Sequence, residues 1–179
     1  MNILYNSIAY RAEKCREMII NNLYDDYFKS DECKKFLRDH FYTWVYYSGY
    51  KVNGYMSNDV FLNTATATAD HYLSPRMVIS AIVEINKSVL FDKDMFLEAF
   101  LLSRDVVKVS KDQNNLVKFV NKNKKILINK LTIDKYDKFG PWWQVDSKKT
   151  ILNTSTEFPF KHKIPDWFTE YEKKFLIKT

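Results

Sequence analysis

Four residues of the sequence have side chains that can bind a divalent cation or accept a proton. Asp70 and His71 are adjacent. Asn114 and Asn123 come later in the sequence and are separated by nine positions. Carboxylate and amide oxygens are ligands that a hard divalent cation such as Mg²⁺ prefers, and the cation keeps several of its waters. A neutral imidazole can take a proton from an attacking water. These residue types therefore fit metal-assisted hydrolysis.

Asp70 and His71 follow a run in which threonine alternates with alanine. This run consists of Thr64, Ala65, Thr66, Ala67, Thr68 and Ala69. Its two-residue period and β-branched side chains predict a strand that leads into Asp70 and His71. Neighbouring side chains of a strand point to opposite faces, so both can face one metal only if the strand ends or twists there. The loop expected from Leu73 allows this.

Helical patterns surround the predicted strand. Two helices are expected within residues 3–47, broken near Lys29–Asp31, where Ser30 is a suitable N-cap. Further helices are expected over 75–85 behind Pro75, over 92–105 with Asp92 as a cap, after a turn within 111–131, and near 166–177. The sequence is therefore rich in helix on both sides of the strand.

The remaining segments give weaker patterns. Residues 106–110 alternate like a second strand, and residues 48–60 indicate a loop or a short hairpin. The stretch before residue 166, with its GPWW, EFPF and KIPDWF runs, is expected to wrap irregularly.

The order strand, Asp-His pair, helical insertion, strand, Asn, helix, Asn resembles the signature of HNH (ββα-metal) nucleases. DHYLSPR and VSKDQNNLVKFVNKNKK carry the resemblance, over about residues 64–128. The Asn-to-Asn spacing is similar to that of HNH domains in RNA-guided DNA nucleases, whose last motif residue is Asn. The run DQNN is similar to turns in phage-encoded HNH proteins.

The resemblance implies a role for each residue of the motif. His71 is the general base, Asp70 and Asn123 are the ligands of Mg²⁺ or Mn²⁺, and Asn114 fixes the loop that holds the histidine. Two alternatives stay open, because a helix register cannot be read from sequence to within one residue. Asn115 competes with Asn114, and Asn121 competes with Asn123.

These patterns predict an α+β fold: a ββα-metal motif with a helical insertion between its two strands, N-terminal helices and an aromatic-rich C-terminal segment. We expect a single domain over 1–179. Its parts are a helical and aromatic region over 1–60, the HNH-like core over 61–131 and a wrapping segment with the last helix over 132–179.

Two features depart from compact members of that family. The histidine and the first Asn lie further apart, so residues 75–104 must form an insertion. No CxxC pair brackets the motif, so a structural zinc is not expected. The two cysteines, Cys15 and Cys33, are expected to be free and buried.

Basic residues near the motif are candidates for contact with a nucleic-acid backbone. They are Arg76, Lys122, Lys124 and Lys125, and for each of them a solvated helix face is the competing interpretation.

Other aromatic and histidine side chains are expected to be structural. His40 is expected to pack, and His162 to lie at the surface. Tyrosines 46, 47, 50 and 55 are expected to complete a core rather than stack on bases, and Trp142 and Trp143 to pack in the same way.

Composition fits a folded domain with an anionic partner. Apolar residues make up 46% of the 179 residues and charged residues 28%, and the net charge is +6. No apolar run is long enough to span a membrane, and no signal peptide is recognised, so a cytoplasmic protein is expected, in the host cytoplasm if phage-encoded.

Three functions are consistent with these observations. The first is a Mg²⁺- or Mn²⁺-dependent endonuclease acting on DNA, in which cutting both strands would favour a homodimer, whereas nicking needs only one site. The second is a non-catalytic nucleic-acid-binding protein with a degenerate HNH-like fold. The third is a phage accessory or inhibitor protein that presents its tyrosines to a protein partner.

Overall fold

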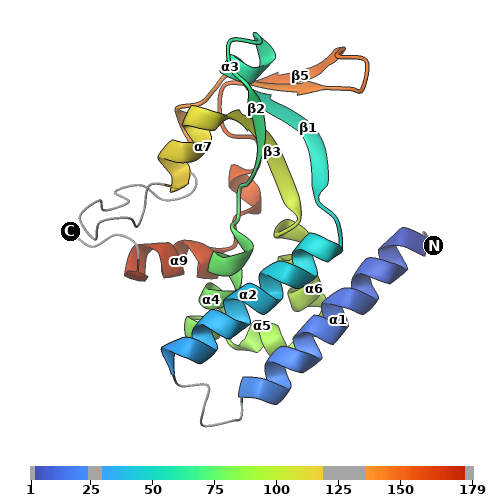
Figure 1. The fold of residues 1–179 in the computed structure, drawn as a ribbon, viewed down its shortest axis with the longest axis vertical. Helices are drawn as coiled ribbons and strands as arrows, with labels where there is room; N and C mark the ends of the chain where they lie inside the picture. Colours follow the sequence, from blue (N-terminus) through green and yellow to red (C-terminus); the bar gives the residue numbers. More distant parts are fainter. Residues whose placement is uncertain (1–2, 24–29, 119–135, 176–179) are drawn as a thin grey trace. The chain divides into compact units, whose positions relative to one another are not determined.

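A computed structural model describes residues 3–23, 30–118 and 136–175 of the chain (Figure 1). It contains helices and a mixed sheet of five strands, which confirms the predicted α+β class. Within these ranges no helix is long and apolar enough to cross a membrane.

The residues cluster into two compact units. Residues 1–51 and 73–105 form a helical unit, and residues 52–72 and 106–179 form a unit built on the sheet. The chain therefore passes between the units at three points along the sequence. The predicted division into 1–60, 61–131 and 132–179 stays a prediction.

The helical unit has five helices in its described part. They are α1 (Ile3–Leu23), α2 (Asp31–Tyr47), α4 (Pro75–Glu84), α5 (Ser88–Phe91) and α6 (Lys93–Leu102). In Figure 1, α1 and α2 run antiparallel, and α2 also packs on α4 while α1 packs on α6. Phe41 of α2 meets Phe96 and Phe100 of α6 edge to face, which fills the core between them.

The helix starts follow the predicted caps. The Ser30 hydroxyl accepts a hydrogen bond from the amide of Cys33, and the Asp92 carboxylate accepts from the amides of Asp94 and Met95. Each cap satisfies amides that have no partner within the first helical turn. The expected free and buried state of Cys15 and Cys33 is also confirmed.

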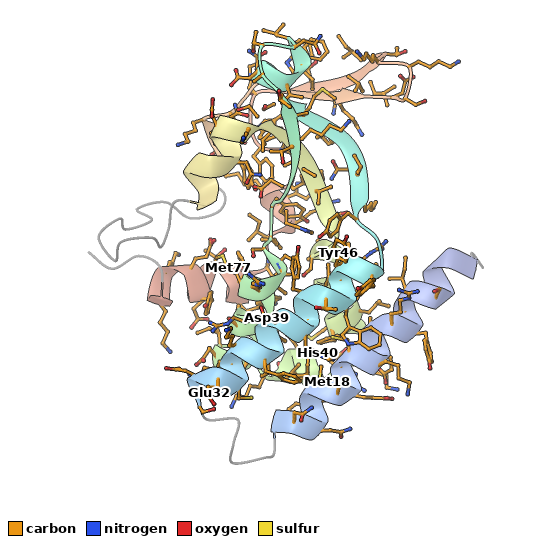
Figure 2. All side chains as sticks on the ribbon, in the orientation of Figure 1. Met18, Glu32, Asp39, His40, Tyr46 and Met77 are labelled. Atoms are coloured by element: carbon orange, nitrogen blue, oxygen red, sulfur yellow. The ribbon has the colours of Figure 1, made fainter. Side chains whose placement is uncertain are left out.

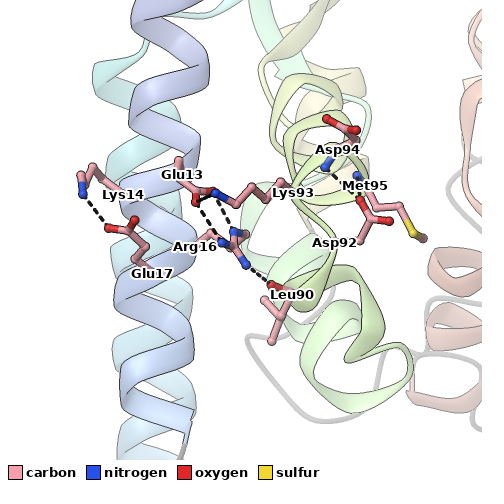
Figure 3. Close-up of polar contacts among 9 residues, drawn as sticks. All are labelled: Glu13, Lys14, Arg16, Glu17, Leu90, Asp92, Lys93, Asp94 and Met95. Atoms are coloured by element: carbon pink, nitrogen blue, oxygen red, sulfur yellow. Dashed lines mark hydrogen bonds and ion pairs between the residues drawn. The ribbon is translucent and has the colours of Figure 1, made fainter.

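A charged cluster joins three helices of this unit (Figure 3). Arg16 of α1 donates to both carboxylate oxygens of Glu13, at 2.8 and 2.9 Å, and to the backbone carbonyl of Leu90 at 2.7 Å. Lys93 of α6 lies 2.8 Å from the same carboxylate. The bonds from Arg16, and then those from Lys93, lower the pKa of Glu13 from 4.5 to about 2.

The sheet unit has the strand order β2-β3-β1-β4-β5. Its elements are β1 (Lys51–Ser57), α3 (Asn58–Phe61), β2 (Ala67–His71), β3 (Asp105–Ser110), α7 (Lys111–Lys118), β4 (Trp142–Val145), β5 (Ile151–Ser155), a 3-10 turn (Lys161–Lys163) and α9 (Asp166–Phe175). The two predicted strands are β2 and β3, and the predicted last helix is α9.

Three local predictions were wrong. Residues 51–57 form the strand β1, in which Gly54 adopts a positive φ of 82° where the backbone approaches the carbonyl of Val145. No turn separates β3 from the next helix, because α7 begins at Lys111 directly after Ser110. Residues 142–155 pair as the β4–β5 hairpin, where an irregular wrap was expected.

A capping box explains the abrupt start of α7. The hydroxyl of Ser110 accepts from the amide of Gln113 at 3.1 Å, and the Gln113 carboxamide oxygen accepts from the amide of Ser110 at 2.9 Å. The same oxygen accepts from the Ser57 hydroxyl at 2.7 Å, and the carboxamide nitrogen donates to Asp59 at 2.9 Å. Gln113 therefore fixes α7 to β3, β1 and α3.

The charged cluster predicts a pH dependence of stability. Because the folded-state pKa of Glu13 is depressed, its stabilisation is complete above about pH 4.5 and is lost as the pH falls towards 2. We expect Glu13→Gln to lower the thermal midpoint at pH 6 and to leave it nearly unchanged relative to wild type near pH 2. Thermal unfolding between pH 2 and 6 measures this, with exposed Glu98→Gln as the control. Parallel wild-type and Glu13→Gln profiles would contradict it.

The Gln113 carboxamide predicts a second stability effect. Gln113→Ala removes the partner of the Ser110 amide and of the buried Ser57 hydroxyl, so we expect the free energy of unfolding to fall by about 1–3 kcal/mol. Urea unfolding measures this, and Lys111→Ala at an exposed position of the same helix is the control. Equal midpoints for the two variants would show that the carboxamide does not anchor α7.

Candidate functional site

The strands β2 and β3 and the helix α7 position the residues of the candidate site. β2 pairs antiparallel with β3, with Asp70 opposite Val107 and His71 opposite Val106. The helix α7 follows β3 directly and packs against β2. Residues far apart in sequence are thus brought onto one strand pair and the helix beside it.

Asn114 joins the helix to the strand. Its side chain is buried, and its amide nitrogen donates to the hydroxyl of Thr68 at 3.4 Å. Within the described ranges its carboxamide oxygen has no hydrogen-bond partner. Asn114 therefore contacts β2 two residues before Asp70, whereas the HNH resemblance implies that it fixes the loop that holds the histidine.

Tyr136 holds Asp70 in place. The Tyr136 hydroxyl donates to the Asp70 carboxylate and lies 3.1 Å from the backbone carbonyl of His71. Tyr136 is fully buried, and burial raises its pKa well above the usual value, with the Asp70 charge adding to the effect. The phenol therefore stays protonated and acts as a donor. No local pattern in the sequence indicated this role for Tyr136.

The strand separates the two motif residues. β2 continues through His71, so alternation places Asp70 on the face of Thr68 and His71 on the face of Ala69. β2 ends at His71, so the strand ends at the pair, which is one of the two conditions under which both side chains can approach one metal.

A lysine shares the face of His71. Lys108 of β3 lies opposite Ala69, two pairs away from the pair of His71 with Val106, with the pair of Asp70 and Val107 between them. Diagonal neighbours of this kind lie roughly 7–8 Å apart between backbone positions, within reach of a long side chain. Ala69 is exposed, whereas His71 and Lys108 are half-buried and the Nδ1 atom of His71 is buried. Sequence reasoning did not single out Lys108.

The metal donors that the structure describes are few. Among these residues no group of three or more His, Cys, Asp and Glu side chains could hold a metal ion. Asp70 is the described member of the predicted ligand pair. Asn123, its competitor Asn121, and Lys122, Lys124 and Lys125 lie outside the described residues, as does the side chain of Asn115.

Arg76, the remaining predicted contact, belongs to the helical unit. Its guanidinium lies 2.9 Å from the carboxylate of Asp39, which Figure 2 labels on α2, and 5.1 Å from the centre of the Tyr42 ring. Arg76 therefore already has partners within its own unit.

The structural predictions for other side chains have mixed outcomes. His40 is half-buried and stacks on Phe36, and His162 is exposed, as predicted. Tyr46 and Tyr47 are 53% and 70% exposed, so the prediction that they complete a core was wrong (Figure 2 labels Tyr46). Trp142 is fully buried, which confirms its packing role.

The net positive charge of the chain belongs to one unit. The helical unit contains 12 basic and 12 acidic residues, whereas the sheet unit contains 16 basic and 10 acidic residues. The unit that holds Asp70 and His71 is therefore the one whose field attracts a polyanion.

Comparison with known proteins identifies no relative. No family model, no curated protein and no solved structure matches the chain.

The bond between Tyr136 and Asp70 predicts a stability effect. Tyr136→Phe keeps the ring packing and removes a donor to a carboxylate, so we expect the free energy of unfolding to fall by about 1.5–3 kcal/mol. Tyr55→Phe is the matched control, because its hydroxyl takes part in an exposed bond with Asn153. Urea unfolding measures the free energy of unfolding of both variants. Equal losses of this free energy in Tyr136→Phe and Tyr55→Phe would contradict a strong interior hydrogen bond between Tyr136 and the Asp70 carboxylate.

Proposed function

We propose that the protein is a metal-dependent endonuclease that hydrolyses phosphodiester bonds in DNA, with β2, β3 and α7 as a ββα unit of the HNH type. The observation that carries the proposal is the hydrogen bond from Asn114 of α7 to Thr68 of β2. It holds the helix against the strand of Asp70 and His71, in the order of elements that the HNH resemblance implies.

Asp70 and Asn123 would hold Mg²⁺ or Mn²⁺ in this proposal. Their donor set of one carboxylate and one amide oxygen suits a hard cation that keeps several waters. The bound cation would stabilise negative charge on the scissile phosphate and the leaving oxygen. The buried hydroxyl of Tyr136 orients the Asp70 carboxylate, as hydrogen-bonding partners of metal ligands commonly do.

His71 and Lys108 would act on the substrate. Because β2 ends at His71, the imidazole can approach the side of Asp70 and take the proton of the attacking water, and the ammonium group of Lys108 would offset the charge of a neighbouring backbone phosphate. The excess of basic residues in the sheet unit favours DNA as the substrate.

A second candidate is a nucleic-acid-binding protein that does not cut. The alternation along β2 favours it, because Asp70 and His71 project from opposite faces of the strand. Such a protein would show salt-dependent binding to DNA and no cleavage.

Cleavage of supercoiled and linear DNA tests the first candidate. We expect cutting with Mg²⁺ or Mn²⁺, none with EDTA, and a rate about 10²- to 10⁴-fold lower for His71→Ala, the range that general-base catalysis contributes. His162→Ala, an exposed histidine of the same unit, is the matched control and should cut like wild type.

The contrary outcomes separate the candidates. Undiminished cutting by a folded His71→Ala variant would remove His71 from the reaction. Salt-sensitive DNA binding by a wild-type protein that never cuts under these conditions would replace the endonuclease with the second candidate.

A further inference from the structure

The β4–β5 hairpin of the sheet unit ends in a turn that its own hydrogen bonds hold. The carboxylate of Asp146 accepts from the backbone amides of Lys148 and Thr150, each at 2.8 Å. The backbone of Asp146 also pairs with Thr150 and Lys149, at 3.1 Å each. The shape of the tip is therefore fixed locally, without support from other elements.

The tip carries cations on its outer side. Lys148 and Lys149 are both exposed, and neither takes part in an ion pair within the described ranges. The nearest acid in sequence, Asp146, uses a carboxylate oxygen on the backbone amides of the turn. The tip thus presents two adjacent positive charges to the solvent.

Large apolar side chains lie next to these lysines. Ile151 is 49% exposed and Leu152 is 60% exposed, at consecutive positions of β5. Gln144 pairs with Asn153 and Val145 pairs with Ile151, so Leu152 is the extra residue of a β-bulge, and both apolar side chains are exposed at this irregular point of the hairpin. β5 is also an edge of the sheet, and in Figure 1 the hairpin extends outward from the sheet of its unit.

This combination fits one kind of partner. A two-stranded ribbon can enter the major groove of double-stranded DNA, lysines neutralise phosphates, and apolar side chains contact or wedge between base steps. The hairpin belongs to the unit with 16 basic and 10 acidic residues, so its charge complements a polyanion.

We propose that the β4–β5 hairpin is a duplex DNA contact, in which Lys148 and Lys149 bind phosphates and Ile151 and Leu152 pack into the groove. The proposal rests on the proposed function for its choice of DNA, and it adds the part of the chain that grips the substrate away from the Asp70 and His71 motif.

Binding of a fluorescently labelled DNA duplex in EDTA tests the contact without cleavage. Anisotropy titrations over a salt series compare wild type with Lys148→Glu/Lys149→Glu. We expect at least tenfold weaker binding and a log–log salt slope shallower by about 1.8, from about 0.9 for each of two lost phosphate contacts.

The matched control is Lys35→Glu/Lys87→Glu, which makes the same change of charge at two exposed positions of the helical unit. It should bind within about threefold of wild type, an effect of net charge alone. Ile151→Ser/Leu152→Ser should weaken binding with an unchanged salt slope, because it removes apolar contact and no charge. Urea unfolding verifies that each variant folds.

Three results would overturn the contact: a wild-type protein that does not bind the duplex, equal losses for the two lysine pairs, or unchanged binding by both hairpin variants. Loss of self-association in Ile151→Ser/Leu152→Ser with unchanged DNA binding would show that the edge strand β5 contacts a second copy of the chain and not DNA. Failure of the nuclease proposal can be told apart from failure of the DNA contact. A protein that binds DNA through the hairpin and does not cut it would refute the nuclease proposal alone.

Discussion

The hydrogen bonds of the Gln113 carboxamide fix the position of α7 in the sheet unit. The carboxamide oxygen and nitrogen together serve Ser110, Ser57 and Asp59, which belong to or flank three different elements. Buried polar groups of this kind are costly unless every partner is present, so the network specifies one position for α7. Asn114 is the next residue along the helix, and its contact with β2 follows from that position.

A cluster of rings supports the other side of the site. Tyr136 stacks on Phe158 with ring centres 4.5 Å apart, and Trp142 meets both rings at steeper angles. This packing places a phenol hydroxyl in the interior, where it requires an acceptor, and Asp70 provides one. The position of the carboxylate thus depends on residues more than 60 positions away in sequence.

The sequence predicted what short-range physics determines. Apolar spacing and caps at Ser30 and Asp92 located helices, and the Thr and Ala alternation located β2, because these signals act within a few residues. The serine-to-glutamine spacing of a capping box is present at Ser110 and Gln113, and it starts α7 at Lys111, where the polar residues had indicated a turn.

Long-range pairing was beyond such signals. β4 and β5 were missed because Gly140, Pro141 and the tryptophans indicate irregular chain, while their strand character comes from pairing with β1 and with each other. Tyr136 was missed because its role exists only once distant segments pack. Composition likewise could not tell that Tyr46 and Tyr47 face the solvent.

The pairing of His71 with Val106 has a consequence for how the chain folds. The 34 residues between them leave one strand and return directly opposite, and most of them belong to the helical unit. Closing a flexible loop of that length costs conformational entropy before any strand contact forms, and the cost grows only slowly with length. Helices that collapse first would hold the two ends of the insertion close together and reduce this cost. Formation of the helical unit would then set the rate at which β2 and β3 pair, and the Asp70 and His71 motif would be among the last parts of the molecule to assemble.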